Sequence, residues 1–173
     1  MTMREVIRKV DKHGERWLLL VFYSMIVATI ATEVVRRFGL NYSSIWGEEI
    51  ARYSFIYLAW IGASAAVKER AHIRIDVILH YLPSRGKIAV YLLGDILMVV
   101  LAVFCLYWSL KPIATSIEFD SVTHGLRISQ AWFTAAVPLG FSMILFRLVQ
   151  SINRDIRDFY HGRSAFAGNT LFD

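Results

Sequence analysis

The sequence offers almost none of the groups from which an active site is usually built. It contains one cysteine, Cys105, which excludes an internal disulfide and cysteine-pair redox chemistry. This thiol lies within an apolar run, where it is expected to be an unreactive packing residue. There is no glycine-rich phosphate loop and no Ser/His/Asp arrangement of the kind used in nucleophilic catalysis. We therefore expect that the protein is not an enzyme.

Histidine is also missing from the places where a membrane cofactor would need it. A haem held between membrane helices requires histidines within the helices. All five histidines fall outside the long apolar runs: His13, His72, His80, His124 and His161. His72 and Asp76 are four residues apart, but two such groups form a hydrogen-bonded pair more often than a metal site. We expect no cofactor and no bound metal.

Charged residues are scarce and apolar residues abundant. Charged residues make up 19% and apolar residues 56% of the 173 positions, compared with about 25% and roughly 45–50% in soluble domains. The net charge is +5, but no basic stretch is long or interleaved with aromatic residues, which argues against nucleic-acid binding. This composition indicates a small protein that crosses a membrane several times.

Four apolar segments are long enough to cross a hydrocarbon layer of about 30 Å, which requires roughly 20 helical residues. They cover residues 17–38, 50–67, 88–110 and 131–149. A backbone surrounded by lipid must satisfy its own hydrogen bonds, so these segments are expected to be helices. The predicted fold is an all-α integral membrane protein whose four-helix transmembrane domain spans residues 17–150.

The distribution of positive charge predicts the orientation. The segment before the first span and the loop 68–87 each contain five Lys or Arg residues, and four more lie between Arg147 and the C-terminus. The positive-inside rule places these regions, and hence both termini, in the cytoplasm. Residues 1–16 have the pattern of a short amphipathic helix on the membrane surface, and the segment after His72 is a second candidate. Residues 151–173 are expected to form a cytoplasmic tail.

Several charged residues are candidates for functional contacts. Glu48 and Arg52 are four residues apart and should share one face at the start of the second helix. They fit either an anchored helix start or a charged contact with a partner protein. Asp95 lies inside the third span, where a carboxylate is costly. It fits an interhelical contact better than an ion path, because ion paths usually gather several ligands.

The order of several short motifs resembles the small membrane subunit of tripartite ATP-independent periplasmic (TRAP) transporters, the DctQ-like family. The resemblance covers most of the chain, from the first span to the end of the fourth. The motifs are WGEEIAR at 46–52, Gly62 in IGAS, AHIRID at 71–76, Leu82-Pro83 and VPLG at 137–140. Tyr57 stands where the family often has tryptophan, and Ser129-Gln130 where it often has a proline.

The resemblance implies a non-catalytic scaffold, or stator, in the bacterial inner membrane. Its partners would be membrane lipid, a large M-type membrane subunit that moves the substrate, and a periplasmic substrate-binding protein, during sodium-coupled uptake of an organic acid. The expected partner or scaffold contacts are Trp46, Glu48, Glu49, Arg52, Gly62, His72, Arg74 and Asp76. The expected docking residues are Lys111, Glu118, Asp120 and Arg127. Without the resemblance, an independent four-span protein such as an electron-transfer subunit or a small channel remains an alternative.

Overall fold

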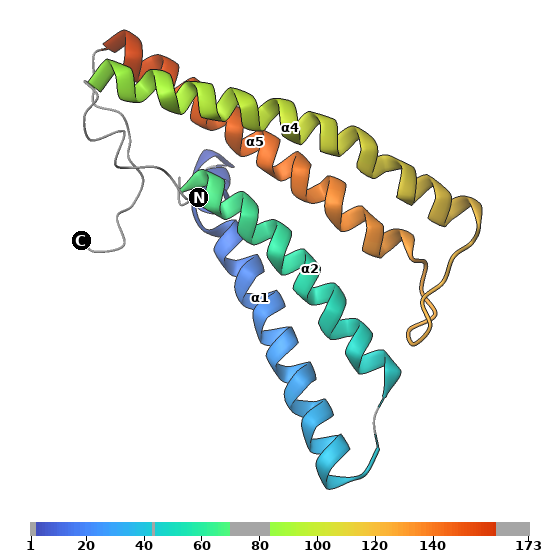
Figure 1. Cartoon of the computed structure of the whole chain (residues 1–173). Coiled ribbons are helices and arrows are strands. Elements are labelled where there is room, and N and C mark those ends of the chain that lie inside the picture. The colour runs from blue at the N-terminus through green and yellow to red at the C-terminus, as the bar shows by residue number, and fades with distance from the viewer. Residues whose placement is uncertain (1–2, 43, 70–83, 162–173) are drawn as a thin grey trace.

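The computed structural model describes residues 3–42, 44–69 and 84–161, and these residues form four long helices (Figure 1). None of the described residues belongs to a strand, apart from one isolated bridge between Val122 and Ser129. The helices are α1 (Met3–Gly39), α2 (Ile45–Lys68), α4 (Ser84–Glu118) and α5 (Ala131–His161). All four contain a stretch long and apolar enough to cross a membrane. The prediction of an all-helical protein with four candidate spans is confirmed.

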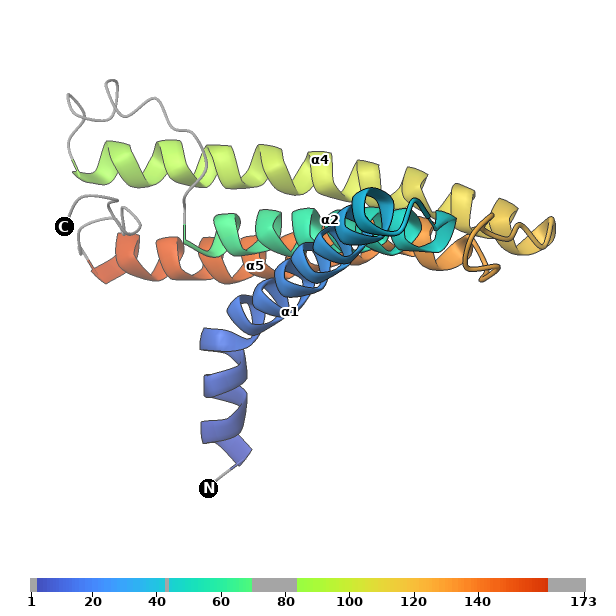
Figure 2. The same ribbon diagram turned by 90° about the horizontal axis from the view of Figure 1, so that it is seen from below.

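The helices extend beyond the predicted spans. The third span was expected to end at about residue 110, just before Pro112, but α4 continues through this proline to Glu118. Helix α5 likewise continues through Pro138. Residues 3–16, predicted to form a separate surface helix, are the first turns of α1, and in Figure 2 this beginning of α1 runs at a steep angle to the rest. The second candidate surface helix, after His72, lies outside the described residues.

The helices form an open row in the order α1, α2, α5, α4. The main contacts are between α1 and α2, between α2 and α5, and between α5 and α4 (Figures 1 and 2). The short connections between α1 and α2 and between α4 and α5 lie at one end of the row, here called the short-loop end. The opposite end, where α2 and α5 finish and α4 begins, is called the terminal end. Helices α1 and α4 therefore form the two edges of the row.

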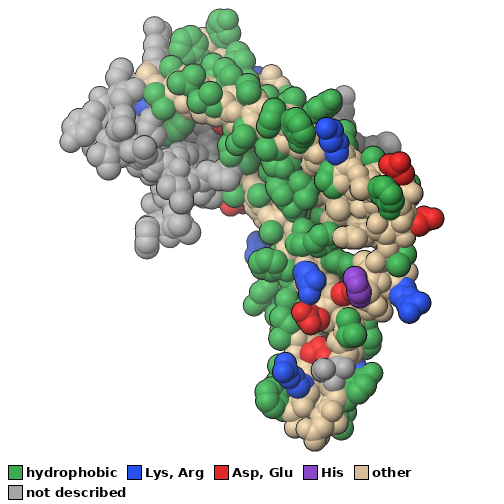
Figure 3. Space-filling view, turned by 45° about the vertical axis from the view of Figure 1, so that its right-hand side comes forward, with side chains coloured by type: hydrophobic (Ala, Val, Ile, Leu, Met, Phe, Trp, Pro, Cys, Tyr) green, Lys and Arg blue, Asp and Glu red, His purple; other side chains and the backbone are tan. Residues whose placement is uncertain are grey.

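The interior is small compared with the apolar surface. Val67, Ala102, Ile144 and Leu148 form a buried cluster where α2, α4 and α5 meet, and Trp60 packs against it. Large apolar side chains are exposed along both edge helices. On α4 they include Leu93, Leu97, Val100, Leu101, Phe104 and Tyr107, all at least 60% exposed. Figure 3 shows apolar side chains covering much of one face, with charged groups gathered towards the short-loop end. Such surfaces suit lipid or a partner protein rather than water.

Close packing between α2 and α5 depends on Gly140 in the VPLG segment. A Cβ atom at this position would lie 2.5 Å from Cε3 of Trp60, which is too close for any real contact. The ring of Trp60 also meets Phe141, with their centroids 4.7 Å apart. The absence of a side chain at Gly140 therefore lets the indole of Trp60 lie directly on the backbone of α5, as small residues do between membrane helices.

Candidate functional site

The WGEEIAR segment begins α2, and its two adjacent glutamates have opposite environments. Successive residues of a helix are about 100° apart around its axis, so neighbours cannot face the same way. Glu49 is 7% exposed, whereas the side chain of Glu48 is 77% exposed and forms an ion pair with Arg52 at 3.0 Å. The predicted sharing of one face by Glu48 and Arg52 is confirmed. Glu48 and Arg52 face outward, whereas Glu49 faces inward and contacts another part of the same chain.

Glu49 holds the tip of the loop between α4 and α5. One carboxylate oxygen accepts a hydrogen bond from the N–H of Gly125 at 2.8 Å, and the other accepts one from Leu126 at 2.9 Å. Gly125 lies so close to the start of α2 that a Cβ atom would be 2.9 Å from the backbone nitrogen of Trp46. Glu49 is thus joined to a loop 76 and 77 positions further along the chain. The joining hydrogen bonds are charge-assisted, which makes them stronger than bonds between neutral groups.

The same loop is braced internally. The N–H of Thr123 donates to the carbonyl of Ile128 at 2.9 Å, and the N–H of Gln130 donates to that of Ser121 at 2.8 Å. Asp120 and Arg127 adopt positive φ angles of 43° and 52°, which allow the chain to turn sharply at each side. The loop is therefore a short hairpin with a fixed position on α2.

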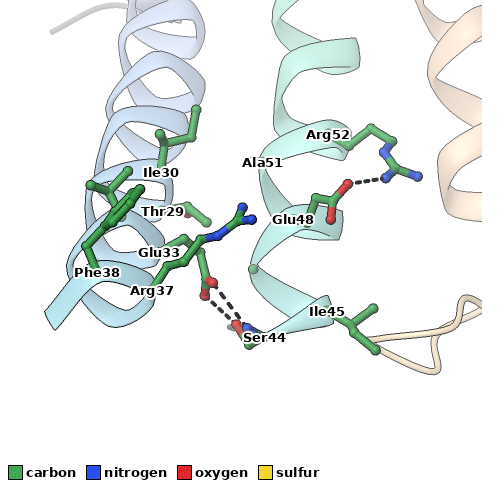
Figure 4. A pocket seen from close by; sticks show the side chains of 12 residues that line it. Thr29, Ile30, Glu33, Arg37, Phe38, Ser44, Ile45, Glu48, Ala51 and Arg52 are labelled. Carbon is green, nitrogen blue, oxygen red and sulfur yellow. Dashed lines mark hydrogen bonds and ion pairs between the residues drawn. The ribbon is translucent and has the colours of Figure 1, made fainter. Parts of the chain in front are cut away.

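A second carboxylate, Glu33 of α1, fixes the connection between α1 and α2. It accepts hydrogen bonds from the hydroxyl and, at 3.2 Å, from the N–H of Ser44, which directly precedes α2 (Figure 4). Arg36 lies 3.4 Å from the same carboxylate. Gly47 leaves room for it, since a Cβ atom there would be 2.5 Å from Glu33 Oε1. Two buried or half-buried acids thus set the geometry of the short-loop end.

Trp46 lies beside this connection. The guanidinium carbon of Arg36 is 5.2 Å from the centroid of the Trp46 ring and 4.8 Å from that of Tyr42, which are cation–π distances. Trp46 is still 42% exposed. Its position at a helix start among cations is typical of an aromatic anchor at a membrane surface.

An open pocket of about 650 Å³ lies between α1 and α2 at the short-loop end. Ile30, Val34 and Phe38 of α1 form an apolar wall, and Glu48 and Arg52 form a polar wall on α2. In Figure 4 the side chain of Arg37 extends from α1 towards α2 at this pocket. The pocket thus combines charged groups of both signs with an apolar wall.

At the terminal end, a buried ionic cluster joins three helices. Glu15 of α1 is 7% exposed. Its Oε1 accepts hydrogen bonds from Arg147 Nε of α5 at 2.8 Å and from the Ser64 hydroxyl of α2 at 3.2 Å, and its Oε2 lies 3.4 Å from Lys68 Nζ. Sequence reasoning missed this cluster, because it treated Arg147 and Lys68 only as indicators of orientation. The available signal was an acid and two bases at the same ends of three predicted spans.

Aromatic residues of α2 line the seam with its neighbours. The Tyr57 hydroxyl donates a hydrogen bond to the carbonyl of Trp132 at 2.7 Å, and its ring stacks on Phe22 of α1 at 5.6 Å. Tyr53 lies 5.0 Å from Phe133 between ring centroids. Tyr57 thus contacts both neighbouring helices of α2.

The remaining predicted contact residues are placed as follows. Gly62 faces α1, where a Cβ atom would be 3.7 Å from Leu19 Cδ2. Asp95 is half-buried in α4, one turn before the core-packing Met98 and Val99. Three predicted residues lie outside the described part of the chain: His72, Arg74 and Asp76.

The four predicted docking residues are all exposed at the short-loop end. Lys111 lies with its ammonium 4.4 Å from the centroid of the Trp108 ring. Glu118 ends α4, and Asp120 and Arg127 belong to the hairpin that Glu49 holds. The structure therefore brings these residues to one end of the row.

Comparison with known proteins gives a consistent match. Residues 25–158 match the family described as "Tripartite ATP-independent periplasmic transporters, DctQ component". A relative named sialic acid TRAP transporter small permease protein SiaQ, from Vibrio cholerae, is 24% identical over 86% of this chain and 84% of its own length.

Two longer proteins match this chain over smaller shares of their own length. The isethionate TRAP transporter permease protein DctMQ of Oleidesulfovibrio alaskensis is 27% identical over 66% of this chain and 18% of its own length. The sialic acid TRAP transporter permease protein SiaT of Haemophilus influenzae is 24% identical over 79% of this chain and 22% of its own.

Proposed function

Because this chain belongs to the DctQ component family of TRAP transporters, we propose that it is the immobile small permease subunit of such a transporter. In this role it pairs with a large M-type membrane subunit and helps a periplasmic substrate-binding protein to dock. The complex takes up an organic acid, driven by a sodium gradient. The family match over residues 25–158 carries this proposal.

The pairing with a larger membrane subunit is supported by the long relatives. This chain corresponds to 18% of DctMQ and 22% of SiaT, so in those permeases a segment of this kind is continuous with a much larger protein. The row of helices has edges covered by exposed apolar side chains, and part of this surface is available to a second membrane protein. The names of these relatives mention isethionate and sialic acid, both organic anions.

A static role is supported by the way in which the short-loop end is held. Both connections are tied by carboxylates to the helices, one by Glu33 and the other by Glu49. With both termini in the cytoplasm, as the charge distribution predicts, this end faces the periplasm. It presents Lys111, Glu118, Asp120 and Arg127 on a braced surface suited to receiving a soluble partner. A braced surface keeps its geometry while a neighbouring subunit moves.

Co-expression with a large TRAP membrane subunit and a TRAP substrate-binding protein from the same organism tests this function. The chain should co-purify with a large membrane subunit, and proteoliposomes containing both, together with the binding protein, should take up substrate only with an inward sodium gradient. Omitting the chain should abolish uptake. Substrate flux through the purified chain alone would contradict a scaffold role.

A further variant separates docking from assembly. Reversing the charges of Glu118, Asp120 and Arg127 together should weaken binding of the soluble protein but leave co-purification with the large subunit intact. Unchanged docking in that variant would contradict the docking role. Arg157 is exposed near the end of α5, at the terminal end of the row. It provides a control, because reversing a charge so far from the loop should affect neither measurement.

A further inference from the structure

We propose that the pocket between α1 and α2 binds a phospholipid with an anionic headgroup, through its phosphodiester group. The site needs only this chain and a bilayer, so it stands apart from the transporter role. The pocket measures about 650 Å³, within the range of roughly 300–1,000 Å³ that is usual for ligand sites. It is formed by two helices of the same chain, so it exists without a second subunit.

The charges that line the pocket favour an anion. Of the four charged lining residues, Glu33 is occupied by Ser44 and Arg36. Arg52 and Glu48 pair with each other at 3.0 Å. Arg37 makes no hydrogen bond or ion pair with any of the residues that the structure describes. The lining itself holds two acids and two arginines. Arg36, just outside it, compensates Glu33, so these five groups together carry a net charge of +1, and Arg37 is the one left without an ionic partner among them. A phosphodiester carries one negative charge. Arginine suits this group because its fork of N–H donors matches phosphate oxygens.

The position of the pocket favours a lipid over a soluble phosphate compound. It lies where α1 ends at Gly39 and α2 begins at Ile45, which is the level of a membrane surface if these helices span the bilayer. Val34 and Ile30 lie about one and two turns deeper in α1 than Arg37, line the same pocket and are each about half exposed. A cationic mouth above an apolar wall matches an amphiphile whose headgroup is anionic and whose chains extend into the hydrocarbon.

The exposed ion pair supports the same occupant. Charged groups within a spanning helix are costly where they face hydrocarbon alone. Arg52 lies seven residues into α2, about 10 Å from its start at 1.5 Å per residue, and 57% of its side chain is exposed. A headgroup seated in the pocket places phosphate oxygens beside Arg37 and Arg52 and shields both from the acyl chains. The lipid thereby provides an ionic partner for Arg37 and a second one for Arg52, which already pairs with Glu48.

Native mass spectrometry of the full chain in detergent tests this site, with phosphatidylglycerol and phosphatidylcholine as probes. We expect phosphatidylglycerol to be retained at least fivefold more strongly than phosphatidylcholine. Arg37→Gln should weaken phosphatidylglycerol binding by about tenfold, as for the loss of one charge-assisted contact, and Arg37→Lys should weaken it less. Arg157→Gln, which removes an exposed arginine from α5, should leave it unchanged. Far-ultraviolet circular dichroism confirms that each variant is folded.

Four results would overturn the site. Equal retention of both lipids would show that headgroup charge is not recognised, and equal losses in Arg37→Gln and Arg157→Gln would show non-specific attraction. Displacement of the lipid by millimolar inorganic phosphate would identify a site for the free ion. In the assembled complex, a Phe38→Cys variant that cross-links to the large subunit would show that protein, not lipid, fills the pocket.

Discussion

Glu15 and Arg147 are 132 residues apart in the chain, yet the carboxylate of one accepts a hydrogen bond from Nε of the other at 2.8 Å. Both side chains are about 8% exposed. Together with Lys68 and Ser64 they join the edge helix α1 to α2 and α5. The removal of one partner from a buried ion pair leaves the other charge uncompensated, and this is strongly destabilising.

Replacement of Glu15 by Gln should therefore lower the free energy of unfolding by about 3 kcal/mol. Unfolding in mixed micelles, followed by circular dichroism against increasing sodium dodecyl sulfate, measures this change. Glu48→Gln is the matched control, because its ion pair is exposed and exposed pairs contribute about 0–1 kcal/mol. Similar effects of the two variants would show that the Glu15 cluster contributes little.

Replacement of Glu49 by Ala should release the tip of the loop between α4 and α5. The N–H groups of Gly125 and Leu126 lose their carboxylate acceptor, and hydrogen bonds to charged groups contribute about 1.5–3 kcal/mol each. Hydrogen exchange of a peptide covering 120–130 should become at least tenfold faster. Glu48→Ala, one position earlier and outward-facing, should leave the exchange rate unchanged. If this peptide exchanged as slowly in Glu49→Ala as in the wild type, the contact between Glu49 and the loop would be contradicted.

Replacement of Gly140 by Ala should force apart α2 and α5. The new Cβ would lie 2.5 Å from the Trp60 ring, and such overpacking costs about 1–3 kcal/mol. Gly94→Ala is the control, because nothing lies within 4 Å of a Cβ at that position and alanine favours a helix by about 1 kcal/mol over glycine. The two substitutions should thus change stability in opposite directions. A loss of stability in Gly94→Ala equal to that in Gly140→Ala would contradict this account of the seam.

The predicted orientation can be tested with single cysteines in a Cys105→Ser background. A membrane-impermeant maleimide applied to intact spheroplasts should label Asp120→Cys, in the loop between α4 and α5, because the positive-inside rule places that loop outside. It should not label Asp158→Cys, near the end of α5, until the membrane is permeabilised. The reverse pattern would invert the orientation and remove the basis for docking at the short-loop end.

The sequence was sufficient to predict the helices but not their partners. Each span is a local run of apolar residues, and lipid requires any such backbone to be helical, so the spans could be read directly. The pairing of Glu48 with Arg52 was also predictable, because it depends only on a spacing of four. The contacts of Glu15 and Glu49 depend instead on which helices become neighbours. A single sequence does not show which helices become neighbours. Glu49 was therefore predicted only as a partner or scaffold contact, and its hydrogen bonds to the loop were not foreseen.

The ends of the helices were less predictable for a related reason. Hydropathy indicates where the hydrocarbon begins and ends, whereas a helix can continue into water or along a surface. Pro112 removes one backbone hydrogen bond and disfavours a regular helix, yet α4 continues through it to Glu118. Burial in lipid and helix length are separate properties, and only the first is encoded in an apolar run.

The open row has a consequence for how the chain assembles. The helices at each edge pack mainly on a partner that is next to them in the sequence, so α1–α2 and α4–α5 are local pairs that can close as soon as both members have entered the bilayer. The seam between α2 and α5, and the salt bridge from Glu15 to Arg147, must wait for the last helix to leave the ribosome. The α1–α2 hairpin can therefore form first, and α5, once inserted, packs on α4 and closes the seam with α2.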